Sequence, residues 1–211
     1  MSVEQNPGPQ LSERNPTSSR RAVLALAALF IVPMLFALWY VNYAGAPGAT
    51  KNYGELVQPA RPLSAFALQT LDGEPFGADE LQGKWSLVYF GGGECGTACA
   101  ENLYKMRQSR LSQGQEIKRV RRLYILLDAA PGDSLSEVLR EHEGLEVLTG
   151  RPAELDSLVA QFDLPGAAPR AAERVYIVDP LGNLMMSYPA GFDAKGLAKD
   201  LRLLLRASQI G

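Results

Sequence analysis

The sequence predicts an α/β protein, in which a mixed sheet is flanked by helices and preceded by one transmembrane helix. Two observations support this prediction. Residues 22–41 are twenty consecutive residues without a charge. From residue 62 onward, short apolar runs that fit buried strands alternate with segments of helical periodicity. The formal charge of −2 and the absence of a basic domain give no sign of a nucleic-acid partner.

Residues 22–44 fit a transmembrane helix. At 1.5 Å per residue, the uncharged stretch spans about 30 Å, the thickness of the hydrocarbon core of a bilayer. Arg20 and Arg21 precede it, and the next basic residue is Lys51. The positive-inside rule therefore places the N-terminus in the cytoplasm and the C-terminal domain in the periplasm. We expect a single-pass protein of the inner (plasma) membrane.

A cleavable signal is the alternative to an uncleaved anchor. Residues 19–24 resemble a twin-arginine export motif, and residues 44–46 have the small-x-small form of a cleavage site. The apolar run is longer than the 7–15 residues typical of a signal peptide, which favours the anchor. Both alternatives deliver the same domain to the same compartment.

The chain is expected to contain four parts. Residues 1–21 are polar and lack apolar periodicity, which predicts a disordered cytoplasmic tail. The transmembrane helix follows at residues 22–44. Residues 45–61 are rich in Gly, Pro and Ala and predict a linker. Residues 62–211 then form the periplasmic domain.

The first half of this domain combines a hairpin signal with two buried strands. Residues 63–71 are apolar at intervals and precede Asp72-Gly73, a hairpin signal. The apolar run 85–90 predicts a central strand, and apolar residues at helical spacing predict a helix over residues 99–111. The run 122–127 predicts a second buried strand.

The second half alternates in the same way and ends on an amphipathic helix. Helices are predicted at residues 135–142, behind a turn and cap at residues 131–134, and at residues 152–162, with proline in the first turn. Strands are predicted at residues 145–148, 174–178 and 184–188, of which the last two are joined by a turn at residues 179–183. Leucines at helical spacing predict the last helix, at residues 193–206.

Both cysteines of the chain, Cys95 and Cys99, follow the apolar run 85–90 in a stretch that contains four glycines. Glycine leaves the backbone free to adopt conformations that other residues avoid. At a strand-to-helix turn, the free N–H groups and the dipole of the helix favour a thiolate, which is the form that exchanges disulfides and binds metals. The negative charges of Glu94 and Glu101 disfavour it.

The spacing of the two cysteines indicates where each must lie. Residues i and i+4 of a helix have Cβ atoms about 5–6 Å apart, whereas a disulfide requires about 3.5–4.5 Å. The pair can close if Cys95 lies in the loop and Cys99 in the first helical turn, and it can open to hold Cu(I) between two soft thiolates. We interpret it as a redox or metal-binding pair. A structural disulfide and two unrelated buried cysteines are the alternatives.

Three other segments carry weaker signals. His142 lies between two glutamates on a predicted surface helix, so we expect a solvated side chain rather than a ligand. The basic run at residues 116–122 could dock an acidic partner, but a solvated lead-in to a strand is the expected role. Met185 and Met186 face opposite ways on a strand, so core packing is expected for one of them.

The motifs taken together resemble the Sco/SenC group of thioredoxin-like cytochrome oxidase assembly proteins. The resemblance rests on the anchor, on the strand that ends in Phe90-Gly91 before CxxxC, and on Leu103, four residues after the second cysteine. Residues 123–128 with the following Asp133-Ser134, and RVYIVDPLG at residues 174–182, add to it. It covers roughly residues 62–206 and implies a thioredoxin-like fold, copper as a candidate cargo, and an oxidase subunit or another assembly factor as partner.

The sequence departs from this family at the copper site. The histidine that completes the copper site of Sco proteins falls at Ala171, and the usual prolines after the cysteines are Gly96 and Ala100. A Cu(II) site of two thiolates and an imidazole is therefore not expected, whereas Cu(I) binding by the thiolates alone remains. Glu173 stands where thioredoxins and TlpA-like reductases have a cis-proline, so the chain is not a standard member of that group.

These observations favour a membrane-anchored, Sco-like accessory factor for cytochrome c oxidase biogenesis. The resemblance implies thiol–disulfide exchange or transient Cu(I) binding by Cys95 and Cys99, and their positions suggest Cys95 as the attacking thiol and Cys99 as the resolving one. One alternative is a general periplasmic thiol–disulfide oxidoreductase unrelated to copper. The other is a docking module whose disulfide is structural.

Overall fold

The computed structural model describes residues 16–43, 52–208 and 210. The chain divides into two units, Met1–Lys51 and Asn52–Gly211, and each is described by itself. The described part of the first unit is the helix α1, Pro16–Tyr43. Its stretch Arg20–Tyr40 has a mean hydropathy of 2.5 and is long and apolar enough to cross a membrane. The side chains of residues 20–40 are all exposed, as the apolar surface of a lipid-facing helix would be.

The start of α1 differs from the expected boundary between tail and anchor. The helix begins at Pro16, so residues 16–21 of the expected disordered tail are helical. Proline is tolerated there because the first helical N–H groups have no intrahelical partner. Residues 1–15 of the expected tail, residue 44 of the expected anchor and residues 45–51 of the expected linker lie outside the described residues.

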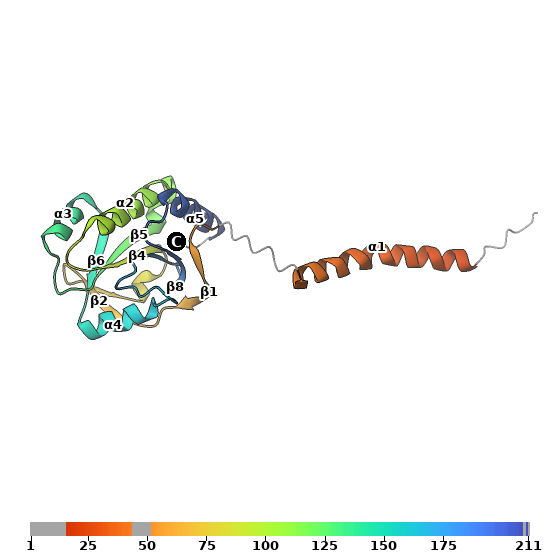
Figure 1. The fold of residues 1–211 in the computed structure, drawn as a ribbon, viewed down its shortest axis with the longest axis horizontal. Helices are drawn as coiled ribbons and strands as arrows, with labels where there is room; N and C mark the ends of the chain where they lie inside the picture. The colour runs from red at the N-terminus through yellow and green to blue at the C-terminus, as the bar shows by residue number, and fades with distance from the viewer. Residues whose placement is uncertain (1–15, 44–51, 209, 211) are drawn as a thin grey trace, which may run out of the picture. The chain divides into compact units, whose positions relative to one another are not determined.

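The second unit is built on one mixed sheet of eight strands in the order β1-β8-β7-β4-β5-β6-β2-β3 (Figure 1). The strands are β1 Glu55–Pro62, β2 Ala67–Thr70, β3 Pro75–Gly77, β4 Trp85–Gly91, β5 Val120–Leu126, β6 Leu145–Thr149, β7 Val175–Val178 and β8 Asn183–Tyr188. β5 runs parallel to β4 and to β6, and the other neighbours are antiparallel. The predicted mixed sheet is confirmed.

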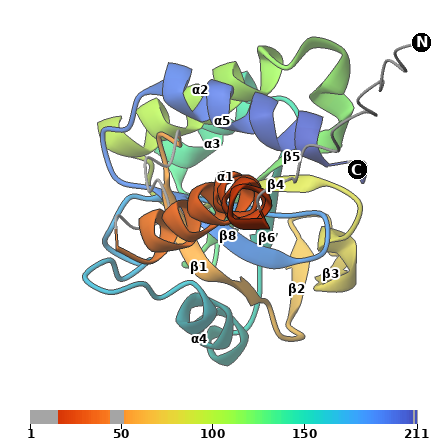
Figure 2. The same ribbon diagram turned by 90° about the vertical axis from the view of Figure 1, so that its right-hand side faces the viewer.

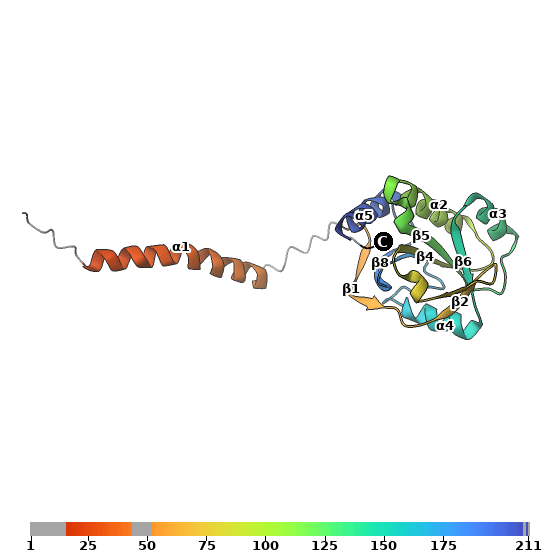
Figure 3. The same cartoon turned by 180° about the vertical axis from the view of Figure 1, so that it is seen from behind.

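Helices cover both faces of this sheet. They are α2 Thr97–Leu111, α3 Asp133–Glu141, α4 Pro152–Gln161 and α5 Ala194–Ala207, with short 3₁₀ helices η1 Asp79–Leu81 and η2 Gly114–Arg119. Figures 1 and 3 show α2, α3 and α5 on one face and α4 on the other, and Figure 2 shows the same layers from the side. Each face has its own apolar core, and the two cysteines belong to the core beneath α2, α3 and α5.

β4 lies at the centre of the sheet and contributes to both cores. Leu87 and Tyr89 pack in the core beneath α2, whereas Val88 and Phe90 pack in the core beside α4. A strand covered on both faces is apolar along its whole length, which explains why the run was recognisable in the sequence. Because β4 and β5 are parallel, with Gly91 opposite Leu126, the loops that follow them leave the same edge of the sheet.

β1 falls in the region that the sequence suggested as linker. Glu55–Pro62 pair antiparallel with β8, and Leu56 lies opposite Met186. Proline, abundant in this stretch, is tolerated on an edge strand, and β1 is the edge strand on this side. The high Gly, Pro and Ala content therefore concealed a short strand whose half-buried Leu56 packs against the core.

The expectation that His142 is solvated is wrong, and the solvated lead-in ends before Val120, where the buried strand begins two residues earlier than expected. His142 and Arg122 are only 7% and 1% exposed. α3 ends at Glu141, and His142 turns inward. Its Nδ1 lies 3.5 Å from Nη1 of Arg122, and Nη2 of the same arginine donates to the Glu143 carbonyl at 2.6 Å. Burial, followed by the charges of Arg110 and Arg107, lowers the pKa of Arg122 to about 10. The expectation for the methionines is confirmed, since Met186 is buried in the core.

Candidate functional site

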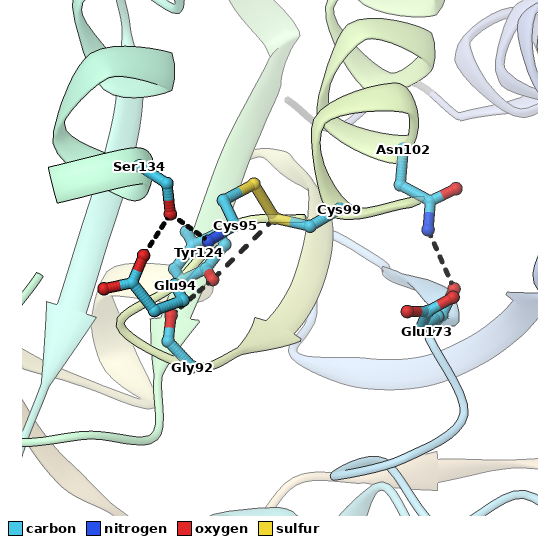
Figure 4. Close-up of a disulfide and its surroundings, with 8 residues drawn as sticks. All are labelled: Gly92, Glu94, Cys95, Cys99, Asn102, Tyr124, Ser134 and Glu173. Atoms are coloured by element: carbon cyan, nitrogen blue, oxygen red, sulfur yellow. Dashed lines mark hydrogen bonds between the residues drawn. A yellow bond between two sulfur atoms is a disulfide. The ribbon is translucent and has the colours of Figure 1, made fainter. Parts of the chain in front are cut away.

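Cys95 and Cys99 form a disulfide with Cα atoms 5.2 Å apart (Figure 4). Cys95 lies in the loop after β4, before the N-cap residue Gly96, and Cys99 is the third residue of α2. The structure thus places the pair across the boundary between loop and helix, as the spacing of the cysteines predicted. Both residues are buried, with 6% and 7% of their surface exposed.

The cysteine loop is fixed by the loop that follows β5. The Gly93 N–H donates to the Asp128 carboxylate at 2.5 Å, and the Gly132 N–H donates to the Gly93 carbonyl at 2.7 Å. Gly93 is buried, so these bonds satisfy backbone groups that water does not reach. The parallel pairing of β4 and β5 brings these two loops together.

Ser134, the second residue of α3, contacts the loop beside the sulfur atoms. Its hydroxyl accepts a hydrogen bond from the Cys95 N–H at 2.9 Å and donates one to the carboxylate of Glu94, as Figure 4 shows. The contact fixes the backbone of Cys95 and engages the carboxylate next to it in the sequence. Ser134 was expected in the cap of α3, but the N-cap residue is Gly132 and has no side chain to cap the helix.

Tyr124, from β5, lies behind Cys99. Its hydroxyl donates to the Gly92 carbonyl at 2.8 Å and lies 4.0 Å from the Cys99 sulfur (Figure 4). The side chain is completely buried, and burial is the main cause that raises its pKa, followed by the charges of Tyr89 and Asp128. The phenol is therefore neutral and carries its proton at physiological pH.

Asn102 connects α2 to the segment that precedes β7. Its side-chain amide, buried one turn after Cys99, donates to the Glu173 carbonyl at 3.0 Å. Glu173 has a φ of 44°, in the left-handed region that side chains other than glycine rarely adopt. Figure 4 shows this bond, which connects the helix that carries Cys99 to the position where thioredoxins have a cis-proline.

The donor set around the cysteines bears on copper. Among the described residues, no group of three or more His, Cys, Asp or Glu side chains could hold a metal ion. Ala171 stands where the Sco histidine was expected and is exposed. His142 is engaged by Arg122 through Nδ1, which leaves the proton on Nε2 and the ring without a free lone pair for a metal. The two sulfur atoms are thus the metal-ligand atoms that this site offers.

A groove between α2 and α3 gives access to Cys95. Its volume is about 650 Å³, and Cys95 lines one part of it. Thr97, Ala100, Glu101 and Tyr104 line the side of α2, and Val138, Glu141 and His142 line the side of α3. Among the described residues that line it, Cys95 is the cysteine present, whereas the sulfur of Cys99 lies against Tyr124.

Sequence reasoning found the cysteines but missed the residues that surround them. Asp128 and Ser134 were noticed as part of the family resemblance, without a contact to the loop. Tyr124 stood in an apolar run with no sign of its hydroxyl contact. Asn102 is the one polar residue here whose burial the sequence could have indicated, because it lies between Cys99 and Leu103 on the buried side of a helix.

Residues 85–208 match the model of a family described as transmembrane-like, thioredoxin-like, C-terminal domain. The sequence is 27% identical to mitochondrial protein SCO2 of Saccharomyces cerevisiae over an alignment of 158 residues. This alignment covers 67% of this chain and 52% of SCO2. The chain thus spans about half the length of that curated relative.

Two solved structures share the fold. Yeast Sco1 with copper bound has a TM-score of 0.61 and 21% identity, over 72% of this chain and 96% of that chain. BsSco is described as a member of the Sco family of cytochrome c oxidase assembly proteins with a disulfide switch. It has a TM-score of 0.56 and 18% identity, over 71% of this chain and 96% of the BsSco chain. The predicted thioredoxin-like fold and the resemblance to Sco proteins are confirmed. Since the family model covers more than half of its residues, the chain belongs to the family of transmembrane-like, thioredoxin-like C-terminal domains.

Proposed function

We propose that this chain is a membrane-anchored, Sco-like accessory factor for cytochrome c oxidase biogenesis that acts through the Cys95–Cys99 dithiol. The observation that carries the proposal is the disulfide across a loop and a helix start, with Cys95 lining a groove and the Cys99 sulfur 4.0 Å from the Tyr124 hydroxyl. The similarity to SCO2 and the fold shared with copper-bound Sco1 and with BsSco support it.

Thiol–disulfide exchange would proceed in two steps. In the reduced domain, the Cys95 thiolate attacks a disulfide of the partner, which forms a mixed disulfide and releases one partner thiolate. The Cys99 thiolate then attacks the Cys95 sulfur, which breaks the mixed disulfide and releases the second partner thiolate. Two electrons pass to the partner, and the domain ends in the oxidised form described above. The reverse steps oxidise a partner dithiol.

Transient Cu(I) binding would use the same two sulfur atoms. Two soft thiolates suit Cu(I), and the absence of an imidazole from the donor set disfavours Cu(II). Copper is then a cargo held only by the reduced domain. Closure of the disulfide removes both ligands, so cargo binding and exchange exclude each other at any moment.

We place the domain on the periplasmic side of the inner membrane. The basic residues before the apolar helix and the absence of others up to Lys51 support a cytoplasmic N-terminus. The order of tail, anchor, linker and periplasmic domain is kept, with the anchor inside α1, and the domain includes β1, so the linker ends before Glu55 instead of at residue 61. The partner would be an oxidase subunit or another assembly factor that presents cysteines to the groove.

A general periplasmic oxidoreductase is the second candidate. The exposed Ala171 at the expected histidine position favours it, because exchange needs two sulfur atoms and no third ligand. Copper titration of the reduced full-length chain in detergent micelles, in competition with a Cu(I) chelator, separates the two. Failure to compete with a chelator of moderate affinity would leave the oxidoreductase.

Replacement of both cysteines by serine tests the role in cells. We expect lower oxidase assembly in cells with the double variant and normal assembly with a control variant at an exposed serine such as Ser157→Ala on α4. The reduction potential of the purified chain provides the second measurement. A value well below about −300 mV, together with unchanged assembly, would contradict the proposal and indicate a structural disulfide in a docking module.

A further inference from the structure

We propose that Tyr124 is a positioning residue for Cys99. When the disulfide opens, its hydroxyl hydrogen-bonds to the Cys99 sulfur and keeps that sulfur on the inner side of the site. Cys95 is then the sulfur left to the groove and the partner. The inference rests on the proposed redox function, and it assigns the two cysteines their order of attack through a residue outside the CxxxC motif.

The position of the Tyr124 hydroxyl is strictly defined. Tyr124 lies on β5 between paired neighbours, with its side chain 0% exposed. The hydroxyl is 2.8 Å from the Gly92 carbonyl and 4.0 Å from the Cys99 sulfur. A Cβ atom on Gly91 would lie 2.1 Å from the hydroxyl oxygen, so glycine at that position makes room for it. The hydroxyl is held between the loop backbone and the first turn of α2.

The phenol oxygen can accept a hydrogen bond from Cys99 only when the sulfur is reduced. A phenol has one proton to donate and lone pairs that accept. In the oxidised form its proton is directed at Gly92, and the disulfide sulfur at 4.0 Å has no proton to give. In the reduced form, Cys99 gains an S–H that donates to a lone pair of the phenol oxygen, while the phenol proton stays on the Gly92 carbonyl. Reduction therefore adds one buried hydrogen bond that the oxidised form lacks.

The charges around Cys99 favour its S–H form, which is the form that donates this hydrogen bond. The carboxylates of Asp128 and Glu173 act on the buried Tyr124 and Tyr89 pair, and Glu94 adjoins Cys95. These negative charges disfavour a thiolate on the inner side. Tyr89 lies on the same face, with its ring centroid 5.7 Å from that of Tyr124.

A comparison of Tyr124→Phe with Tyr89→Phe tests the proposal in the full-length chain in detergent micelles. The quantity measured is the equilibrium constant between dithiol and disulfide in glutathione buffers, by mass spectrometry after alkylation. Tyr124→Phe loses the bond to Gly92 in both redox states, so this loss cancels. It loses the bond to Cys99 only in the reduced state, so we expect a shift of about fivefold toward the disulfide. Tyr89→Phe, the matched control, is expected to shift the constant less than twofold.

The infrared S–H stretching band of Cys99 gives a second readout that does not depend on equilibrium stability. In the Cys95→Ser background, Cys99 is the chain's single thiol. A hydrogen-bonded S–H absorbs at lower frequency than a free one, so adding Tyr124→Phe is expected to move the band upward. A purely structural role of Tyr124 would lower the melting temperature and leave both the band and the glutathione equilibrium unchanged.

The results separate this inference from the function on which it rests. An unchanged equilibrium constant in Tyr124→Phe, or an equal shift in Tyr89→Phe, overturns the positioning role while exchange with glutathione still supports the redox function. If the native chain itself does not exchange with glutathione, the redox function fails, and the positioning role fails with it. A fivefold shift confined to Tyr124→Phe, together with the moved S–H band, supports the proposal.

Discussion

The Asn102 side chain donates a hydrogen bond to the Glu173 carbonyl across 71 residues of sequence. This bond connects the helix that carries Cys99 to the segment that leads into β7. We expect Asn102→Ala to lower the free energy of unfolding by about 1 kcal/mol, because a partly buried hydrogen bond is lost. Urea unfolding of the chain in micelles measures the change. Gln108→Ala, half-buried on the same helix, is the control, and an equal loss in both variants would contradict the assignment.

The carboxylate of Asp200 fixes the entrance of the chain into the domain. One of its oxygens accepts hydrogen bonds from the N–H groups of Tyr53 and Gly54, at 2.7 and 3.0 Å, and from the Tyr188 hydroxyl at 2.6 Å. We expect Asp200→Ala to cost about 2–4 kcal/mol of unfolding free energy and Tyr188→Phe, which removes one of the three bonds, about 1 kcal/mol. Denaturant unfolding checks both. A larger effect of Tyr188→Phe than of Asp200→Ala would be inconsistent with this network.

The stability of the domain should depend on the protonation of His142. Burial, followed by the charges of Arg122 and Arg107, lowers its pKa below the usual 6.5. A lowered pKa means that the folded state prefers the neutral ring, so the stabilisation is present above about pH 6.5 and is lost as the pH falls toward the folded value. We expect the free energy of unfolding to decrease between pH 7 and pH 5.

His142→Gln should remove this component of the pH dependence. His142 is the chain's one histidine, so the difference between native and variant in this range reports on it directly. The measurement is a series of urea unfolding curves at constant ionic strength. Parallel pH profiles for the two chains would show that His142 has the same pKa in the folded and unfolded states.

The groove beside Cys95 should discriminate between large and small thiols. Thr97 is exposed and lines it, so Thr97→Trp is expected to slow the reaction with a protein partner at least tenfold while the reaction with dithiothreitol changes less than threefold. Glu137→Trp, exposed on α3 outside the residues that line the groove, is the control. Equal rates for native chain and Thr97→Trp with the protein partner would mean that the partner approaches from another side.

The parts of the fold that were predictable are those with a local signal. β4 is buried on both faces, so its whole length is apolar, and the glycines and cysteines after it mark the end of the strand. The Cys95–Cys99 contact spans four residues, and helix geometry alone restricts where each cysteine can lie. β1 was not predicted, because an edge strand tolerates proline and the prolines of this stretch indicated a linker.

The parts of the site that were not predictable depend on distant contacts. Tyr124 meets Cys99 only because β5 lies parallel to β4 beneath α2, and the residue itself is one more apolar-looking member of a strand. Asn102 and Glu173 approach each other across the sheet. His142 was expected in water, because a histidine between two glutamates carries no sign of a buried partner such as Arg122. Only the tertiary arrangement supplies these pairs.

The bonds from Tyr53 and Gly54 to Asp200 also have a mechanical consequence. Any tension transmitted along the chain from the apolar helix reaches the domain at this point, before it reaches β1. Because Asp200 lies on α5, the load passes into a helix packed on the core instead of peeling the edge strand away from β8 one bond at a time. The cysteine loop is held by different contacts, at the carboxyl edge of β4 and β5.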